Sequence, residues 1–343
     1  MLTSELIIEE ARRLGFALAG VSGDLATRAS ELYGWWLGQG YAANMHYLQF
    51  QKHRRASLTN ILPGAKSVVV CALAFPGPED AGESAADEAV MTNAHPSANT
   101  GHEPPYHGKV ARYAQGRDYH DVLKEKLTAL AAYIDATGEI APESRSLAYV
   151  DTGALPERAY AAQAGIGWIG KNAMLIHPDQ GSWFWLGEVI TTAALAPGMP
   201  QVDRCGSCRR CLDACPTGAI LEGVRAIDSR KCISYLTIEH RGPLPKEHKS
   251  AIGDWLVGCD ICQEVCPWNQ RSLRAGRAGI GEPPLEFLNL NEISEMDKAA
   301  FKHRFAERSI SRAKLEGLQR NAAIVAENIS LSSQDAAITE QKN

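Results

Sequence analysis

Two cysteine-rich runs organise this chain: Cys205-Gly-Ser-Cys208-Arg-Arg-Cys211-Leu-Asp-Ala-Cys215-Pro216 and Cys259-Asp-Ile-Cys262-Gln-Glu-Val-Cys266-Pro267. The first run has the C-x2-C-x2-C-x3-C-P spacing that wraps a [4Fe–4S] cubane, and in two-cluster proteins its fourth Cys ligates the other cluster. The second run keeps the C-x2-C-x3-C remainder of this pattern. Cys232, between the two runs, is the residue available to replace the missing first Cys.

The spacing therefore predicts two clusters with interleaved ligands. One cluster is expected on Cys205, Cys208, Cys211 and Cys266, and the other on Cys215, Cys232, Cys259 and Cys262. Two zinc sites are the alternative, since four thiolates also suit tetrahedral Zn²⁺. Three closely spaced Cys, a fourth before Pro and the repeated ending favour iron–sulfur clusters. A disulfide framework fits less well, because nothing at the amino terminus resembles a signal peptide.

Length and composition predict a soluble globular protein of two or three domains. The chain has 343 residues, 45% of them hydrophobic and 22% charged, and its net charge of -5 argues against a protein that is basic all over. No apolar run approaches the length of a transmembrane helix, so we expect a cytoplasmic protein with no membrane contact. The acidic segment 76–105 is expected to be a flexible loop.

The residues before the cysteine runs alternate helix-like and strand-like patterns, which predicts an α+β domain. Residues 67–75 have the pattern of a strand buried on both faces, and Cys71 within it is interpreted as core packing. A short strand at 147–150 leads into Asp151, and a helix begins near Pro156. A carboxylate at the carboxyl end of a strand is a recurrent catalytic position, but Asp is also a common turn and cap residue.

The sequence contains no P-loop and no convincing nicotinamide fingerprint. Gly165, Gly167 and Gly170 precede a strand-like run instead of a helix, so we expect these glycines to let the backbone pass close to a large planar ligand. A pair of iron–sulfur clusters passes single electrons but performs no bond chemistry on an organic substrate. The preceding domain is therefore expected to carry a cofactor and a substrate pocket.

A basic segment follows the cysteine runs. Between residues 297 and 320, seven Lys and Arg residues stand against three acidic residues. Arg304, Arg308 and Arg312 fall at i, i+4 and i+8, so in a helix they would form one basic stripe. On a chain that is acidic overall, this stripe predicts contact with a polyanion, and an ordinary solvated face is the alternative.

Several long motifs closely resemble those of the epoxyqueuosine reductase family: Val150-Asp-Thr-Gly153, Gly165-Ile-Gly-Trp-Ile-Gly-Lys-Asn172, Gly181-Ser-Trp-Phe-Trp-Leu-Gly-Glu188 and Gly258-Cys-Asp-Ile-Cys-Gln-Glu-Val-Cys-Pro-Trp-Asn269. The resemblance implies a cobalamin-dependent iron–sulfur oxidoreductase that reduces epoxyqueuosine to queuosine at the wobble position of tRNA. An external low-potential donor would feed electrons through both clusters to form cob(I)alamin, a nucleophile that opens the epoxide, and water would leave.

The resemblance also implies roles for individual residues. Asp151 would protonate the departing oxygen, with a pKa raised by desolvation beside an apolar corrin. Tyr119 and His120 would line the substrate side, while Arg55 and Asn172 would contact the periphery of the corrin.

The expected architecture follows from the same resemblance: a nitroreductase-like cobalamin-binding catalytic domain at 1–198, a bacterial-ferredoxin-like 2[4Fe–4S] domain at 199–275, a short HEAT-like helical region at 276–330 that contacts tRNA, and a disordered tail at 331–343. The basic stripe would hold the tRNA stem while the base is extruded. Longer relatives end in RNA-binding helical repeats, whereas this chain has about one repeat-like helix at 315–328. We expect a monomer.

Two other functions stay open at this point. A non-catalytic iron–sulfur electron carrier would bind no corrinoid tightly. A reductive dehalogenase that acts on a small molecule would have no use for the basic stripe. Binding of a corrinoid and of tRNA therefore discriminates between the three functions.

Overall fold

The computed structural model describes residues 3–25, 27–75, 106–137, 144–272 and 284–340, which form two compact units. Unit 1 comprises Met1–Ala74, Tyr119–Arg230 and Ile261–Ser272, and unit 2 comprises Phe75–Asp118, Lys231–Asp260 and Leu273–Asn343. The segment expected to form one ferredoxin-like domain, 199–275, is therefore divided between the two units. The expected acidic loop at 76–105 lies outside the described residues.

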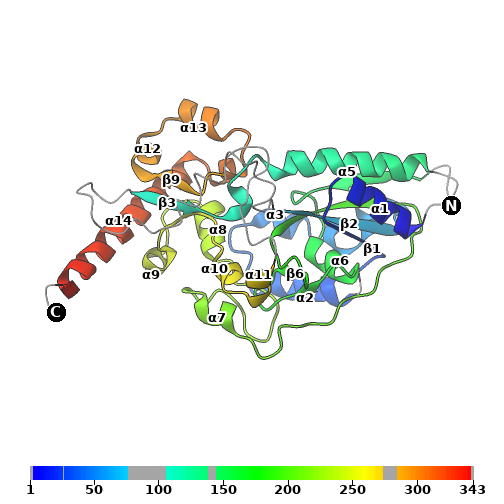
Figure 1. The fold of residues 1–343 in the computed structure, drawn as a ribbon, viewed down its shortest axis with the longest axis horizontal. Helices are drawn as coiled ribbons and strands as arrows, with labels where there is room; N and C mark the ends of the chain where they lie inside the picture. Colours follow the sequence, from blue (N-terminus) through cyan, green and yellow to red (C-terminus); the bar gives the residue numbers. More distant parts are fainter. Residues whose placement is uncertain (1–2, 26, 76–105, 138–143, 273–283, 341–343) are drawn as a thin grey trace. The chain divides into compact units, whose positions relative to one another are not determined.

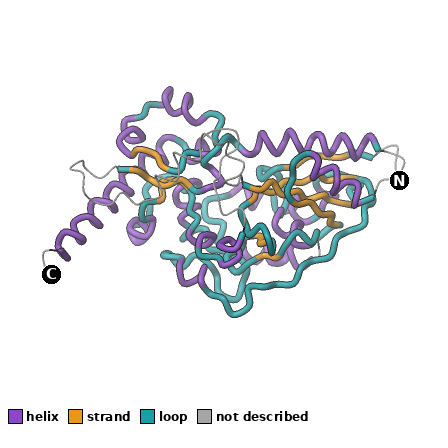
Figure 2. Tube along the Cα trace, viewed as in Figure 1, coloured by secondary structure: helices purple, strands orange, loops and turns teal. Residues whose placement is uncertain are grey.

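An antiparallel sheet forms the centre of unit 1 (orange in Figure 2), and within the described residues it has four strands. The strands lie in the order β1 (Leu18–Ser22), β2 (Ser67–Ala74), β7 (Phe184–Thr191) and β4 (Ser146–Tyr149). β2 pairs with β7 along its whole length, with Cys71 opposite Gly187. Cys71 is fully buried, so its predicted role in core packing is confirmed.

Helices cover both faces of this sheet. On one face lie α5 (Tyr119–Ala136), which packs on β4 and β7, and α1 (Ser4–Arg13), which packs on β1 and α5 (Figure 1). Gly187 of β7 lies against Leu127 of α5. Successive residues of a strand face opposite sides, and Ile190 accordingly packs with Tyr160 of α6 (Glu157–Gln163) on the other face. Unit 1 is thus a helix–sheet–helix arrangement, in agreement with the predicted mixed α and β class.

The rest of unit 1 consists of short elements that surround this centre. They are α2 (Thr27–Gly38), α3 (His46–Phe50), the 3₁₀ helices η1 (Arg54–Ala56) and η2 (Leu58–Asn60), the hairpin strands β5 (Trp168–Ile169) and β6 (Leu175–Ile176), α7 (Arg210–Ala214), α10 (Ile261–Glu264) and α11 (Pro267–Arg271).

Unit 2 contains a second sheet, in which β3 (His107–Val110) lies between β8 (Trp255–Val257) and β9 (Phe287–Asn289). Its helices are α8 (Ile233–Ile238), α9 (Lys246–Lys249), α12 (Leu290–Glu295), α13 (Lys298–Phe305) and α14 (Leu315–Glu340), with 3₁₀ helices η4 (Arg112–Ala114), η5 (Ser250–Ile252) and η6 (Ser309–Ala313). Buried Asn321 of α14 donates hydrogen bonds to the carbonyls of Thr237 and Leu256, and these bonds join α14 to α8 and β8.

α14 continues further than the sequence predicts. Residues 331–343 are expected to be disordered, but the helix extends to Glu340. The hydroxyls of Ser330, Ser332 and Ser333 donate to carbonyls four residues earlier, a pattern that a continuous helix accommodates. Residues 341–343 lie outside the described part of the chain. None of the described helices is both long enough and apolar enough to span a bilayer.

Candidate active site

The loop that follows β4 forms the centre of the candidate active site. Asp151 in this loop has φ +33°, a left-handed conformation that is uncommon for residues other than Gly. The backbone N–H of Asp151 donates to Glu157 Oε1 at 2.7 Å. Because Glu157 is the first residue of α6, the helix that follows the loop also closes it. Unusual backbone conformations of this kind cluster at functional sites.

Arg55 holds the same loop through a second set of contacts. Its guanidinium donates to the carbonyl of Leu155 at 2.9 Å, to the carbonyl of Gly153 at 3.2 Å and to Gln51 Oε1 at 2.9 Å. Its Nε is buried and has no hydrogen-bond partner among the described residues. Arg55 thus supports the Asp151 loop, and its predicted contact with a corrin stays a prediction.

Tyr119 and His120 lie at the start of α5 and reach Asp151. His120 Nε2 is 3.2 Å from Asp151 Oδ2, and the Tyr119 side chain also forms a hydrogen bond with this carboxylate. The Tyr119 ring stacks on His120 with centroids 4.1 Å apart and on Trp185 of β7 with centroids 5.8 Å apart. The structure therefore brings the predicted acid and both predicted pocket residues into one cluster.

The pKa of Asp151 lies below its ordinary value. Desolvation is the largest single influence and raises this pKa, but hydrogen bonds from His120 and Tyr119 together with the positive charges of His120 and Arg55 lower it by more. The Asp151 side chain is still 56% exposed, so water also helps to stabilise the carboxylate. The family resemblance implies a raised pKa for Asp151, but in the protein without bound cofactor or substrate this pKa is lowered. The reason is that charged and hydrogen-bonding partners outweigh desolvation.

Two further carboxyl groups lie next to Asp151. Glu188, in the middle of β7, is fully buried, and no donor among the described residues reaches either of its oxygens. The carboxyl of Glu157 is the neighbour that most affects its charge. Burial, helped by the negative charge of Asp151, raises the pKa of Glu157 to about 8. Burial and the nearby charges of Glu157 and Asp151 also raise the pKa of Glu188 well above its ordinary value.

The sequence alone did not indicate that Glu157 and Glu188 lie next to Asp151. The available signal was a glutamate inside an apolar strand, Leu186-Gly-Glu-Val-Ile190, where an ionised side chain has no place unless it is paired. The position of Glu157 gives no comparable signal, because an acidic residue in the first turn of a helix is common.

The four predicted ligands of the first cluster lie together in unit 1. Burial raises the pKa of the Cys211 and Cys266 thiols. The pKa of Cys211 is raised further by the charges of Cys205 and Cys266. The pKa of Cys266 is raised further by the charges of Cys205 and Cys208. Such mutual effects require neighbouring sulfur atoms. Among the described residues, no three Cys, His, Asp or Glu side chains meet closely enough to hold a single metal ion.

The hairpin β5–β6 secures the cysteine runs. Lys171 Nζ donates to the carbonyls of Gly206 and Cys208, both at 2.8 Å. Asn172 is only 4% exposed, and its Nδ2 donates to the carbonyl of Cys262 at 3.3 Å. Asn172 therefore fixes the loop that carries Cys262, a predicted ligand, and its own predicted contact with a corrin stays a prediction.

The predicted ligands of the second cluster are distributed over both units. Cys215 and Cys262 belong to unit 1, whereas Cys232 and Cys259 belong to unit 2. Their assignment to one cluster stays a prediction.

The glycines before β6 lie close to other parts of the protein. A Cβ on Gly165 would lie 2.5 Å from the carbonyl oxygen of Met199, and a Cβ on Gly167 would lie 2.2 Å from that of Ile176. A Cβ on Gly170 would lie 2.4 Å from Ile176 Cδ1. The expected contact of these glycines with a planar ligand stays a prediction. They allow close packing within the protein itself.

The expected basic stripe at Arg304, Arg308 and Arg312 is also corrected. α13 ends at Phe305, Arg308 has an extended backbone, and Arg312 lies in η6, so the three residues do not share one helix. Arg308 donates to a backbone carbonyl at 2.9 Å. Arg304 contacts Glu292 at 2.8 Å, and Arg312 contacts Glu239 at 2.7 and 2.9 Å. These contacts replace the continuous helix that the spacing predicts.

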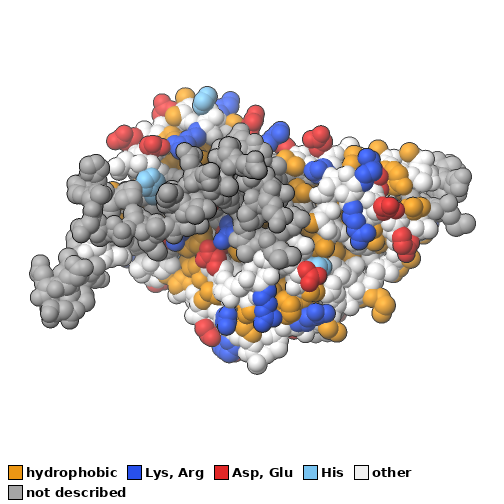
Figure 3. Space-filling view, in the orientation of Figure 1, with side chains coloured by type: hydrophobic (Ala, Val, Ile, Leu, Met, Phe, Trp, Pro, Cys, Tyr) orange, Lys and Arg blue, Asp and Glu red, His pale blue; other side chains and the backbone are white. Residues whose placement is uncertain are grey.

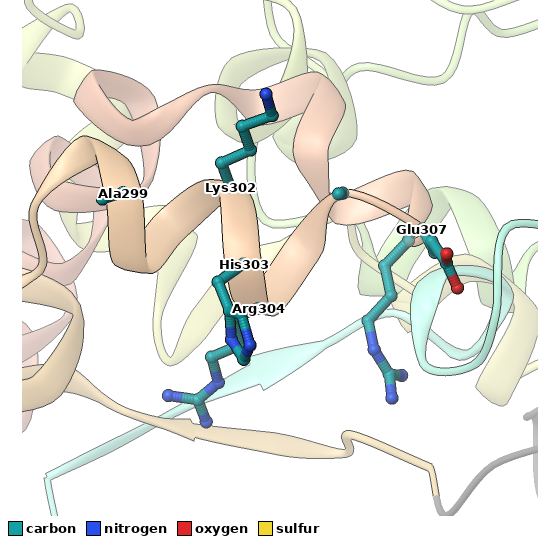
Figure 4. A pocket seen from close by; sticks show the side chains of 7 residues that line it. Ala299, Lys302, His303, Arg304 and Glu307 are labelled. Atoms are coloured by element: carbon teal, nitrogen blue, oxygen red, sulfur yellow. The ribbon is translucent and has the colours of Figure 1, made fainter.

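Unit 2 nevertheless has a basic hollow of ≈ 540 Å³ at the carboxyl end of α13 (Figure 4). Its lining comprises Ala299, Lys302, His303, Arg304, Ala306, Glu307 and Arg308. The lining thus has three Lys or Arg side chains and one acidic side chain, Glu307. Figure 4 shows that Arg304 and His303 point to one side of α13 and Lys302 to the other. In unit 1, Figure 3 shows further Lys and Arg side chains around α7, where Arg204, Arg209 and Arg210 are exposed.

Two protein families match separate segments of the chain. Residues 55–152 match the family described as "Epoxyqueuosine reductase QueG, DUF1730", and residues 204–269 match "4Fe-4S double cluster binding domain". The epoxyqueuosine reductase of Gloeobacter violaceus is 38% identical over 93% of this chain and 94% of its own length. That of Synechocystis sp. is 39% identical over 84% of this chain and 91% of its own length.

Solved structures are similar over nearly the whole chain. An epoxyqueuosine reductase crystallised with a tRNA-Tyr epoxyqueuosine-modified stem loop has a TM-score of 0.78 at 32% identity and covers 94% of this chain and 80% of its own. A Bacillus subtilis epoxyqueuosine reductase, whose catalytic loop is swung out of the active site, has a TM-score of 0.77 at 32% identity and covers 94% and 81%.

Proposed function

The chain belongs to the epoxyqueuosine reductase family and is an oxidoreductase that acts on epoxyqueuosine in tRNA; from this premise we propose that it uses two [4Fe–4S] clusters and cobalamin as cofactors and Asp151 as its proton donor. The reaction removes the epoxide oxygen as water and leaves a carbon–carbon double bond, with consumption of two electrons and two protons. The observation that carries the proposal is the cluster of Asp151, His120 and Tyr119 at the end of β4.

The cysteine sulfurs fit the proposed iron–sulfur chemistry. Cys205, Cys208, Cys211 and Cys266 are close enough in unit 1 to affect one another's charge, and Arg225 donates to Cys205 Sγ at 3.6 Å. A thiolate ligand set with a neighbouring hydrogen-bond donor is typical of such clusters. When bound, the clusters supply single electrons at low potential.

The surroundings of the Asp151 loop fit a corrinoid, whose large ring has apolar faces and an amide-bearing rim. α3 exposes Phe50 by 85% and Tyr47 by 40% shortly before Arg55, which holds this loop. Arg55 Nε is a buried donor that no described residue satisfies. The segment 47–55 thus combines exposed aromatic side chains with a buried donor that has no partner among the described residues, and a ligand with apolar faces and a polar rim suits both. When bound and reduced, cobalamin supplies a strong nucleophile for the strained epoxide.

Asp151 carries the proton to the departing oxygen. His120 and Tyr119 fix the orientation of its carboxyl, while its 56% exposure leaves one side accessible to the substrate. The Bacillus subtilis relative with a swung-out catalytic loop suggests that the Asp151 loop also moves in this protein. The contacts that such a movement must break are the hydrogen bond to Glu157 and the two carbonyl contacts of Arg55.

Reconstitution tests the assigned chemistry. Protein prepared without oxygen and loaded with iron, sulfide and cobalamin should convert a stem loop that carries epoxyqueuosine when a reductant is added. Asp151→Asn should bind both cofactors and lose turnover by about 10²- to 10⁴-fold, the usual contribution of a general acid. Exposed Asp121 on α5 provides the control, since Asp121→Asn should retain activity. Full turnover by Asp151→Asn would remove Asp151 from the mechanism.

We propose that the basic hollow on α13 contacts tRNA phosphates through Lys302, Arg304 and Arg308. Each lost phosphate contact should reduce the slope of log K against log salt by about 1. Lys302→Gln with Arg304→Gln should therefore flatten the slope by about 2, whereas Lys66→Gln on unit 1 should leave it unchanged. An unaltered slope in the double variant would exclude the hollow as the tRNA contact.

Binding of the substrate and of the cofactors also tests the two alternative functions, an electron carrier and a small-molecule dehalogenase. Tight binding of cobalamin would exclude a simple electron carrier, and conversion of the stem loop would exclude a dehalogenase specific for small molecules. Because the substrate is a tRNA, we place the reaction in the cytoplasm, in a monomer that receives electrons from an external donor. The exposed arginines around α7 favour an acidic donor protein.

A further inference from the structure

Epoxide reduction consumes two protons for every oxygen removed. One proton is transferred when the carbon–oxygen bond opens, and a second is needed before the oxygen leaves as water. Asp151 can supply only one at a time, and its partners favour the ionised form. The site therefore needs a second source of protons, which is either bulk water or a group within the protein.

Glu188 occupies an unusual position for a carboxyl group. It lies in the centre of the sheet of unit 1, opposite Val70 of β2 and Tyr149 of β4. It is fully buried, and neither oxygen has a donor partner among the described residues. An ionised carboxylate in this environment would be strongly unfavourable without a compensating partner. A protonated Glu188 avoids this unfavourable charge, because its O–H can be donated to a neighbouring carboxyl.

Glu157 is that neighbour and also contacts the catalytic loop. Its side chain interacts with Glu188 in the core, while its Oε1 accepts the backbone N–H of Asp151 at 2.7 Å. Two adjacent carboxyls, of which Glu188 is fully buried and Glu157 partly buried, cannot both ionise, so they retain a proton at neutral pH. The charged and titratable groups that face the pair from the surrounding elements are Asp151, Arg55, Arg158, Tyr160 and Cys71.

The hydroxyl of Tyr160 does not compete for the proton of this pair. It donates to Asp24 Oδ1 at 3.0 Å, so it is already engaged on another side of α6. Cys71 is fully buried in β2, where its thiol serves the core packing. Asp151, whose backbone N–H Glu157 accepts, is therefore the titratable group through which the pair can reach the substrate.

We propose that Glu157 and Glu188 share a proton and pass it to Asp151 during the reaction, so that both protons of epoxide reduction reach the substrate through Asp151. The inference rests on the proposed function, because it assigns the origin of the second proton in that same reaction. Glu157 and Glu188 touch neither substrate nor cofactor in this scheme. They act through Asp151 and are positioning residues that also hold a proton.

The steps balance. Asp151, which its partners keep ionised in the protein by itself, first takes a proton from the Glu157–Glu188 pair or from solvent. It gives this proton to the epoxide oxygen as the first carbon–oxygen bond breaks, which leaves a hydroxyl on the ring and an ionised Asp151. The Glu157–Glu188 pair then protonates Asp151 directly or through one water. Asp151 gives this second proton to the hydroxyl as the other carbon–oxygen bond breaks, the double bond forms and water leaves. Both electrons come from the donor that the reaction already requires, and solvent reloads the pair.

A purely structural role makes a different prediction. If the pair only fills space and forms hydrogen bonds, a glutamine at either position retains the shape and most of the bonds, and the pH dependence of the reaction stays unchanged. If the pair supplies a proton, glutamine removes that supply without a cavity. Glu157→Gln and Glu188→Gln therefore separate the two roles.

The first test needs neither cofactor nor substrate. Infrared difference spectra of the purified full chain, titrated through neutral pH, should show the carbonyl stretch of a protonated carboxyl with the frequency shift that D2O causes. Glu188→Gln should remove or weaken this band, and Thr191→Val, a change at another buried polar residue of β7, should retain it. A wild-type spectrum without the band near neutral pH would overturn the proposal, whatever the enzyme converts.

The second test measures single turnover of reduced, reconstituted protein on an epoxyqueuosine stem loop from about pH 6 to pH 9. The wild-type rate should fall as the pH rises past about 8, where Glu157 loses its proton. Glu188→Gln should lower the rate by about 10- to 100-fold at pH 8 and by less at pH 6, because solvent protons replace the pair at low pH. Thr191→Val should follow the wild-type profile.

The absorption spectra of bound cobalamin and of the clusters show whether each variant is folded. If Glu188→Gln is unstable, Glu157→Gln, at the edge of the core, provides a second variant. A folded glutamine variant with the wild-type rate and pH profile would overturn the proposal. A wild-type protein that shows the infrared band but no turnover would instead refute the proposed function, so the two failures are distinguishable.

Discussion

The raised pKa of Glu157 predicts how the stability of this protein depends on pH. Glu157→Gln replaces the carboxyl by an amide of the same shape, and the new side chain can still accept the N–H of Asp151. Burial raises the pKa of Glu157 from an ordinary value of 4.5 to about 8. The folded chain therefore binds a proton that the unfolded chain releases between these two pH values.

The sign of the effect follows from this linkage. The stability that Glu157 contributes is fully present below about pH 4.5 and is lost as the pH rises through about 8. A shift of this size corresponds to about 5 kcal/mol, since one pKa unit is worth about 1.4 kcal/mol. Because the Glu157 residue is only partly buried in surface area, solvent screening reduces the expected change to about 2 to 3 kcal/mol.

Thermal unfolding of wild type and Glu157→Gln, measured from about pH 5 to pH 9, tests this prediction. The variant should gain stability relative to wild type as the pH rises, by roughly 3 to 4 °C in Tm across the range. Glu125→Gln, at an exposed position of α5, is the control and should show a smaller change. A Tm difference that is independent of pH, or that falls with rising pH, would contradict the assignment of a proton to Glu157.

Two further substitutions test the cofactor ligands and the glycine packing. Cys266→Ser should remove one cluster and about half of the iron per chain, as measured by iron analysis and electron paramagnetic resonance. Cys71→Ala, at a thiol in the core, is the control and should retain both clusters. Full iron content in Cys266→Ser would refute the ligand set. Gly167→Ala should lower the free energy of unfolding by about 1 to 3 kcal/mol in denaturant titrations, because its Cβ would lie 2.2 Å from the carbonyl oxygen of Ile176. The affinity for cobalamin should stay unchanged. Weaker cobalamin binding at unchanged stability would instead support a ligand contact at this glycine.

Local sequence determined the parts of this protein that depend on short spacings. Cys205, Cys208 and Cys211 are separated by the intervals that one cluster needs, so their role follows from the run itself. The apolar run at 67–74 indicated a buried strand, and the end of the next predicted strand placed Asp151 at the edge of a sheet. These signals are local because backbone periodicity and ligand spacing act over a few residues.

Tertiary structure alone decided the properties that depend on which distant groups meet. His120 and Asp151 are separated by 31 positions, and their contact reverses the direction expected for the pKa of Asp151. Glu157 and Glu188 are as far apart in the chain, and only the packing of α6 on β7 makes them share a buried site. Desolvation and interactions between charges depend on distance in space, which the order of residues does not encode locally, so the acid–base character of the site emerged only from the fold.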